Sequence, residues 1–141
     1  MMQETDIKRL IESASEVRKH SYAPYSHFTV GAALMAKDGS IYTGVNVENA
    51  SYPVGICAER TAFVKAVSEG KSEFCAIAIV GGRKEQSVSV HELCYPCGLC
   101  RQFMAEWCKE DFLVIAAKNT DEYCVHPFSE ILPFAFSLSK E

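Results

Sequence analysis

Three cysteines and one glutamate have the types and spacing of a catalytic metal site. Cys57-Ala-Glu59 is followed forty positions later by Pro96-Cys-Gly-Leu-Cys100. Three thiolates leave one tetrahedral position of zinc open, whereas structural zinc sites are usually closed by four protein ligands. A water in that position ionises near neutral pH, and a nearby carboxylate can move its protons. We therefore expect Cys57, Cys97 and Cys100 to hold zinc, and Glu59 to carry protons in hydrolysis at an amine-bearing ring carbon.

Arg60 directly follows Glu59 and has a role that the metal site itself suggests. Three thiolates on one divalent ion give a net negative complex, which is a poor Lewis acid unless neighbouring donors withdraw charge. We expect the Arg60 guanidinium to bind the thiolates. The competing interpretation of Arg60 is an ordinary surface side chain. For Glu59 it is a negative charge that merely stabilises the N-terminus of a helix.

The remaining cysteines and the histidines fit the metal site less well. A C-x-x-C pair also occurs in redox motifs, so a reactive dithiol is the alternative to zinc. Small buried side chains are the expectation for the other four cysteines, which are Cys75, Cys94, Cys108 and Cys124. None of the four histidines has ligand spacing relative to the three candidate cysteines.

Hydrophobic periodicity predicts the elements that must position these residues. The predicted helices run from about Thr5 to His20, Ala58 to Glu69 and Gly98 to Lys109, with a short one that has Pro127 at its first position. The predicted strands are Phe28 to Met35, Ile41 to Val47, Phe74 to Val80, Phe112 to Ala117 and Glu122 to Val125.

The order of these elements predicts an α/β fold, a three-layer αβα sandwich with a mixed five-stranded sheet. Asp38-Gly39 supplies the turn of a hairpin, and the short connection before Glu122 requires an antiparallel pair. Cys57 and Cys97 fall at helix N-termini, where backbone N–H groups stabilise thiolates. Two helices that begin at one sheet edge would bring the distant cysteines together.

Composition places the chain among ordinary enzyme subunits. With 141 residues and 48% hydrophobic composition, it is long enough for one core, so we expect a single catalytic domain over 1–141. Apolar runs of membrane-spanning length and a signal peptide are missing from the sequence, which favours a cytoplasmic protein without a membrane partner. The net charge of −4 argues against nucleic acid as a partner.

Four ordered motifs and the C-terminal segment give the chain a family resemblance. The motifs are Tyr22-Ala-Pro-Tyr-Ser-His-Phe28, Gly44-Val-Asn-Val-Glu-Asn-Ala-Ser-Tyr52, Cys57-Ala-Glu-Arg-Thr-Ala62 and Pro96-Cys-Gly-Leu-Cys-Arg-Gln102, and the last segment is Leu132-Pro-Phe-Ala-Phe136. Together they resemble the small, homotetrameric zinc cytidine deaminases nearly end to end. The resemblance implies one zinc ion per subunit and hydrolysis of cytidine or 2'-deoxycytidine to the uridine nucleoside and ammonia, a step of pyrimidine salvage.

The resemblance also implies roles for single residues. Asn46 and Glu48 match the residues that bind the ribose 3'-hydroxyl, Phe28 matches the aromatic side chain against the pyrimidine, and the backbone N–H of Ala58 would hold the base carbonyl. Ala50, Tyr52 and Phe136 match residues that reach a neighbouring subunit's site in the family. Leu99 and Tyr95 replace smaller residues of the family pattern, which leaves substrate preference open.

Three other functions compete with this prediction. A blasticidin S type deaminase shares the zinc motifs, although the Asn46-Val-Glu48 segment favours the cytidine enzymes. A polynucleotide-editing deaminase would need a basic and aromatic surface for its strand. A non-catalytic, zinc-stabilised interaction domain would need a fourth protein ligand and would leave Glu59 without a purpose.

Overall fold

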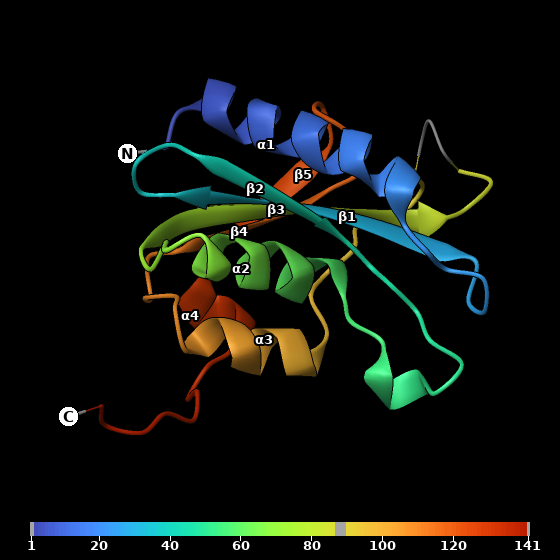
Figure 1. The fold of residues 1–141 in the computed structure, drawn as a ribbon. Coiled ribbons are helices and arrows are strands. Elements are labelled where there is room, and N and C mark those ends of the chain that lie inside the picture. Colours follow the sequence, from blue (N-terminus) through green and yellow to red (C-terminus); the bar gives the residue numbers. More distant parts are fainter. Residues whose placement is uncertain (1, 87–89, 141) are drawn as a thin grey trace.

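The computed structural model describes residues 2–86 and 90–140, in which a five-stranded mixed sheet lies between helices (Figure 1). The helices are α1 (Glu4–Val17), α2 (Ala58–Ser68), α3 (Gly98–Ala105) and α4 (Phe128–Ile131), and the strands are β1 (Phe28–Ala36), β2 (Ile41–Val45), β3 (Phe74–Arg83), β4 (Leu113–Ala117) and β5 (Tyr123–Pro127). The strand order is β2-β1-β3-β4-β5, with β3 and β4 parallel and the other neighbours antiparallel. The predicted mixed sheet is confirmed.

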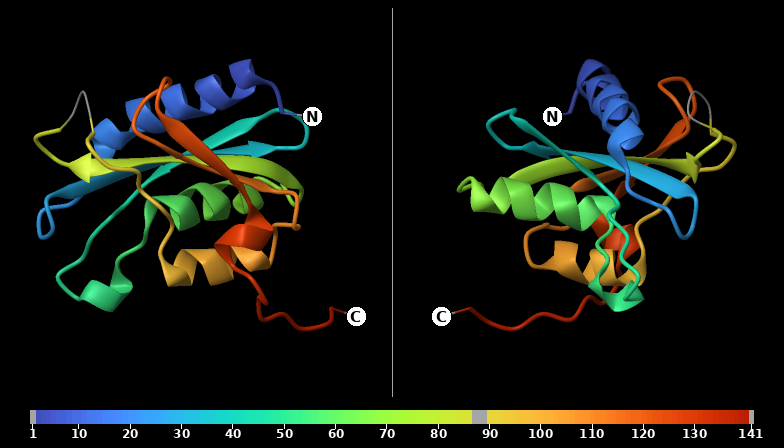
Figure 2. Two further views of the ribbon diagram at one scale, coloured as in Figure 1. Left: turned by 180° about the vertical axis from the view of Figure 1, so that it is seen from behind. Right: turned by 45° about the vertical axis from the view of Figure 1, so that its right-hand side comes forward.

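Helices cover both faces of this sheet and give the predicted three layers. The first helix, α1, lies alone on one face, while α2, α3 and α4 lie on the other (Figures 1 and 2). Leu10, Ile11 and Ala14 recur on one side of α1 and are buried against the sheet, as the helical spacing predicts. Phe63 of α2 anchors the opposite core, where it packs against Phe74, Phe103 and Phe112.

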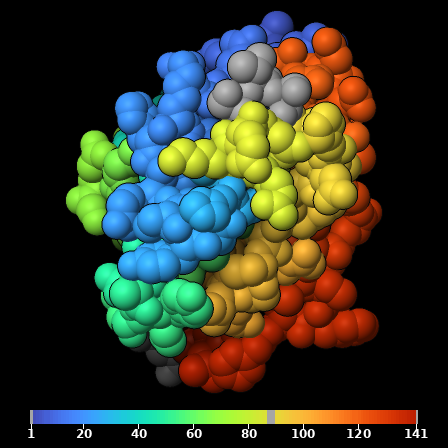
Figure 3. All heavy atoms as spheres, turned by 90° about the vertical axis from the view of Figure 1, so that its right-hand side faces the viewer, coloured from blue at the N-terminus to red at the C-terminus, as the bar shows by residue number. Residues whose placement is uncertain are grey.

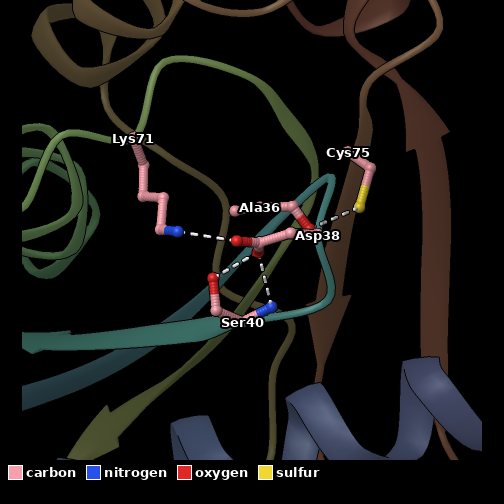
Figure 4. A network of polar contacts seen from close by, with 5 residues as sticks. All are labelled: Ala36, Asp38, Ser40, Lys71 and Cys75. Carbon is pink, nitrogen blue, oxygen red and sulfur yellow. Dashed lines mark hydrogen bonds and ion pairs between the residues drawn. The ribbon is translucent and has the colours of Figure 1, made fainter.

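The hairpin between β1 and β2 closes through the Asp-Gly turn that the sequence predicts. Gly39 adopts a φ of 89°, which a residue without a side chain tolerates readily. The Asp38 carboxylate accepts hydrogen bonds from the Ser40 backbone at 3.0 Å and from Lys71 Nζ at 2.6 Å (Figure 4). Hydrogen bonds from Lys71 and then Ser40 hold the pKa of Asp38 well below its usual range. The hairpin is thereby tied to the segment between α2 and β3.

We expect Asp38→Asn to weaken the dependence of stability on acidic pH. A carboxyl whose pKa is lower in the folded state stabilises above the unfolded value of about 4, and loses that contribution as pH falls towards the folded value. The melting temperature of the wild type should therefore exceed that of the variant at pH 7, and the difference should shrink as pH falls below about 4. Thermal melts at several pH values measure this. Glu12→Gln is the control, because it removes an exposed carboxylate that forms no ion pair among the described residues. Its melting temperature should equal that of the wild type at each pH.

Helices α2 and α3 begin directly after extended residues that are the candidate metal ligands. Cys57 is the N-cap of α2, and Cys97 is the N-cap of α3. Helix α2 also approaches β2 closely, since a Cβ added to Gly44 would lie 2.4 Å from the backbone nitrogen of Ala62. This contact fixes the N-terminal half of α2 against the sheet.

Several details of the structure differ from the prediction. Helix α3 ends at Ala105 rather than Lys109, because the chain turns back and Trp107 packs edge-on against Phe74. Strand β3 continues three residues beyond Val80 to Arg83, since β1 pairs with it there. Pro127 ends β5 and is the N-cap of α4, rather than the first helical residue that the sequence predicts. Cys124 is exposed rather than buried, because β5 is an edge strand.

Each helix of the described residues is too short or too polar to cross a bilayer.

Candidate active site

The three predicted ligands meet at the N-termini of α2 and α3. The Sγ atoms of Cys57, Cys97 and Cys100 all lie within 4.8 Å of one another, and those of Cys57 and Cys97 are 3.7 Å apart. Cys57 and Cys97 are helix caps, while Cys100 is buried in the first turn of α3. The fold thus brings together residues that are far apart in sequence, because both helices lie on the same face of the sheet and begin at the same end of it (Figure 1).

This cluster has the dimensions of a zinc site. A tetrahedral zinc ion with Zn–S bonds of about 2.3 Å needs sulfur atoms about 3.8 Å apart. The observed 3.7 Å between two of the sulfur atoms fits that requirement. Within residues 2–86 and 90–140, no fourth cysteine, histidine or carboxylate joins the cluster. The residues present therefore fit zinc with one position left for a non-protein ligand.

The surroundings of the cluster favour a thiolate at Cys57. Hydrogen bonding from Cys100, and also from Arg60 and Cys97, lowers the pKa of Cys57 to about 5 against the opposing effect of burial. Arg60 Nη2 lies 3.7 Å from Cys57 Sγ and donates to it. Arg60 Nε is buried and has no partner among the described residues. The guanidinium therefore lies against the thiol of Cys57.

Glu59 is a buried carboxyl beside the cysteine cluster. It is 4% exposed, and no salt bridge of the described residues neutralises it. Burial raises the pKa of Glu59 to about 7, and the negative charge of Cys57 adds to this effect, whereas Arg60 lowers it. A solvated charge at a helix N-terminus would not require such burial. This environment favours the proton-carrying interpretation over simple helix stabilisation.

A cavity of about 510 Å³ opens next to Cys57 and Arg60. It lies between the loop before β1 and the loop after β2. Figure 3 looks onto this end of the molecule, where the loop before β1 (blue), the loop after β2 (green) and the segment before α3 (yellow) lie side by side. Asn46, Glu48 and Tyr52 line the cavity. Its volume suits a small molecule of nucleoside size.

Asn46 is held in place by three neighbours and retains one donor. Its Oδ1 accepts from the backbone of Val30 at 2.8 Å and also from the Ser21 hydroxyl. Its Nδ2 donates to the carbonyl of Phe28 at 2.8 Å. Because a side-chain amide has two N–H donors, one remains for a ligand hydroxyl. The amide is oriented by β1 before any ligand arrives.

Glu48 binds the loop that precedes β1. Its Oε1 accepts from the backbone N–H groups of Tyr25 and Ser26 at 3.1 and 3.0 Å, and Oε2 accepts from the Ser26 hydroxyl. Burial opposes ionisation, but the hydrogen bonds from Ser26 and Tyr25 outweigh it and lower the pKa of Glu48. Glu48 is thus a fixed carboxylate with spare acceptor capacity towards the cavity.

Phe28 lies at a neighbouring cavity rather than on the wall of the first one. This second cavity is about 420 Å³ and includes Phe28, Gly81 and Leu93, while Ser26 borders both cavities. The Phe28 ring is partly exposed. Phe28 follows His27, which adopts a φ of 58°, and this turn directs the chain into β1. The structure thus places Phe28 at a different cavity from the one that Asn46 and Glu48 line, although the Phe28 carbonyl accepts a hydrogen bond from Asn46.

The other predicted binding residues are available at the surface or at the helix start. Ala58 is the first residue of α2, so its N–H has no partner within the helix. Ala50 is exposed, and Tyr52 is 74% exposed with its ring edge-on to Tyr25 at 6.0 Å. Phe136 is 66% exposed and lies outside both cavities as the described residues define them.

Two residues of the quoted motifs have structural roles that the sequence reasoning missed. Arg101 donates to the carbonyl of Pro96 at 2.7 Å and to that of Ile131 at 2.8 Å, so it braces the cysteine loop against α4. Ser26 connects Glu48 to the start of β1. Both lie inside motifs that the sequence analysis recognised, but their partners are distant in sequence and only the fold reveals them.

The two departures from the family pattern lie in different surroundings. Leu99 is strongly exposed and lines the 510 Å³ cavity together with Cys57. Tyr95 places its hydroxyl 3.2 Å from Nε2 of His126, whose Nδ1 pairs with Glu130 at 3.1 Å. Neither side chain replaces a ligand of the cysteine cluster.

Comparison with known proteins agrees with this geometry. The family model of the cytidine and deoxycytidylate deaminase zinc-binding region matches residues 4–116. The chain is 46% identical over 132 residues to a cytidine deaminase of Halalkalibacterium halodurans, covering 94% of this chain and 95% of the relative. A crystal structure of cytidine deaminase from Burkholderia pseudomallei superimposes with a TM-score of 0.81 at 42% identity, covering 96% of this chain and 100% of that one. A blasticidin-S deaminase of Bacillus cereus is 33% identical over 110 residues, or 75% of this chain and 76% of the relative.

Proposed function

The chain belongs to the cytidine and deoxycytidylate deaminase family, and from this premise we propose that it hydrolyses cytidine and 2'-deoxycytidine to uridine and 2'-deoxyuridine with release of ammonia. The observation that carries the proposal is the buried Glu59 beside three convergent cysteines. A binding module has no use for an unneutralised carboxyl in that position. The 46% identity to a cytidine deaminase, against 33% to a blasticidin-S deaminase, supports the substrate.

Cys57, Cys97 and Cys100 would hold the zinc ion. When bound, zinc would activate water as the nucleophile near neutral pH and polarise the reacting centre. Arg60 draws negative charge from the thiolates through its contact with Cys57, which keeps the three-cysteine site electrophilic.

Glu59 performs the proton transfers in this proposal. It accepts a proton from the attacking water and gives it to ring N3, which makes C4 more electrophilic. It then takes the second proton from the hydroxyl group now on C4, which becomes the carbonyl, and delivers it to the leaving amine, so a single carboxyl serves both stages. Its burial next to Cys57 keeps the group close to the reacting carbon and away from bulk water.

Recognition of the nucleoside is divided between the helix start and the two loops. The N–H of Ala58 would bind the base carbonyl, and Phe28 would contact the pyrimidine from the neighbouring cavity. The remaining N–H of Asn46 and the Glu48 carboxylate would bind the ribose 3'-hydroxyl, since β1 already orients Asn46 and the loop before β1 already orients Glu48. Orientation in advance lowers the entropy lost on binding.

We further propose that the active protein is a homotetramer with shared active sites in the cytoplasm. Ala50, Tyr52 and Phe136 are exposed in the single chain, which suits residues that complete a neighbour's site. None of the seven cysteines, all of which lie in the described part of the chain, forms a disulfide, which fits a reducing compartment.

Deleting residues 134–141 should weaken both assembly and nucleoside binding. Phe134 and Phe136 are 105% and 66% exposed, and soluble monomers rarely leave such rings uncovered. The tail is held to its own chain mainly by Gln102, which donates to the carbonyl of Phe136, and by the pair Lys140–Glu106. Light scattering should show a smaller particle, and the KM for cytidine should rise, while zinc content stays unchanged.

A point variant separates the two effects of that deletion. Phe136→Ala should raise the KM and leave the particle size unchanged, because the other apolar side chains of the tail remain. A truncated chain that runs as a monomer and deaminates cytidine with unchanged kcat/KM contradicts the shared site.

The proposed activity is tested by incubating the purified, zinc-loaded chain with cytidine, 2'-deoxycytidine or blasticidin S. The ultraviolet change and the ammonia released report turnover of each. We expect turnover of the two cytidine nucleosides. Turnover of blasticidin S alone would assign the chain to the competing class of deaminase, and turnover of none of the three would contradict the proposed function.

A further inference from the structure

Cys94, Gly81 and Phe28 form a contact cluster beside the active site. Gly81 of β3 pairs with Val30 of β1, so it faces the same side of the sheet as Phe28, two residues before Val30. A Cβ added to Gly81 would lie 2.7 Å from Cys94 Sγ and 3.2 Å from Cε1 of Phe28. The thiol and the aromatic ring therefore rest directly on the bare backbone of Gly81.

Cys94 belongs to the same side of the molecule as the helices that carry the site. It packs against the core cluster that includes Ala58 and Phe63 of α2. Burial raises the pKa of Cys94 to about 12, and the negative charges of Glu59 and Cys57 add to this effect while Arg18 opposes it. The thiol is therefore neutral near pH 7 and presents a small, apolar surface.

These contacts place Cys94 beside the Phe28 ring, on the face of the sheet that α2 covers. A pyrimidine that extends from the Phe28 ring towards the start of α2, where Glu59 lies, would therefore lie next to the Cys94 thiol. We propose that Cys94, resting on Gly81, forms the wall that sets the size of the pyrimidine compartment and thereby selects the substituents accepted on the ring. This inference rests on the proposed nucleoside substrate, and it assigns Cys94 a role in specificity rather than in the chemical step.

The wall is tested by binding, which requires no turnover. Calorimetry on the zinc-loaded protein measures the dissociation constants of uridine and of 5-methyluridine, which is larger by one methyl group. In Cys94→Ala the ratio of the 5-methyluridine constant to the uridine constant should fall about tenfold. This is the lower limit of the discrimination that an apolar pocket usually achieves against one extra methyl group. In Cys94→Leu the same ratio should rise, because a larger side chain takes up the space of the methyl group.

A second experiment uses the contact between Gly81 and the Cys94 thiol. Gly81→Ala puts a methyl group 2.7 Å from Cys94 Sγ, so the thiol and the Phe28 ring must shift. We expect weaker uridine binding by about tenfold. Adding Cys94→Ala should recover most of that loss, because the closest atom is removed and the next contacts, at 3.0 and 3.2 Å, can be accommodated.

Cys108→Ala is the matched control, since Cys108 is another half-buried thiol that packs on the same core. Its binding ratio should equal that of the wild type. If the ratio is unchanged in both Cys94 variants, the proposed wall is overturned, whether or not the Gly81 variant folds. Failure of the wild type to deaminate cytidine would instead overturn the proposed function, and the binding ratios would still decide the role of Cys94.

Discussion

Replacing Glu59 by glutamine should lower cytidine turnover by about 100- to 10,000-fold while zinc stays bound, because general acid–base groups typically contribute that much. Glutamine has nearly the same volume, so the buried position at the start of α2 stays filled. The amide can neither accept a proton from water nor donate one to ring N3. Zinc content and deamination are measured on the same sample, which separates loss of the proton carrier from loss of the metal.

Glu69→Gln provides the matched control for this variant. Glu69 lies at the opposite end of the same helix, where it is exposed and far from the cysteine cluster. Its turnover should equal that of the wild type. A Glu59→Gln protein that retains activity within about tenfold of the wild type would show that another group moves the protons.

Replacing Cys97 by alanine should remove the metal and the activity together. Cys97 Sγ lies 3.7 Å from Cys57 Sγ, and two cysteines are too few to hold zinc in a tetrahedral protein site. Metal analysis should show a fall from about one zinc per chain to nearly none. The same result is expected for Cys57→Ala and Cys100→Ala, because the three sulfur atoms form one cluster.

Cysteines outside the cluster serve as controls for this series. Cys75 donates to the carbonyl of Met35 in the sheet, and Cys124 lies exposed on the edge strand. Their alanine variants should keep stoichiometric zinc and wild-type turnover, with at most a modest loss of stability at position 75. A full zinc complement in Cys97→Ala would show that the ligands have been wrongly assigned.

The fold could be predicted largely because its signals are local. The spacing of Leu10, Ile11 and Ala14 predicts α1, and Asp38-Gly39 predicts the hairpin turn, since both depend on neighbouring residues alone. The end of α3 could not be predicted in the same way. It depends on Trp107 reaching Phe74, a contact between segments that are distant in sequence. Cys124 was wrongly expected to be buried because the pattern of a strand does not reveal that it lies at a sheet edge.

In the candidate site, too, the residues could be predicted from sequence motifs, whereas the contacts between distant segments could not. The three ligands and Glu59 follow from residue type and spacing, and the structure brings the three sulfur atoms together. The sequence could not show that Asn46 is fixed by β1 and Glu48 by the loop before it, nor that Phe28 borders a different cavity. The contact of Cys94 with Gly81 is equally invisible in sequence, because it joins β3 to the segment before α3.

Removing and restoring the metal while cytidine deamination is followed tests most directly that the three-cysteine site performs zinc-dependent hydrolysis. Treatment with a chelator should abolish ammonia release from cytidine, and one equivalent of zinc per chain should restore it. Glu59→Gln treated in the same way should take up the same amount of zinc without regaining activity. Deamination at an undiminished rate by the metal-free wild type, or restoration of activity in the metal-loaded Glu59→Gln protein, would contradict this mechanism.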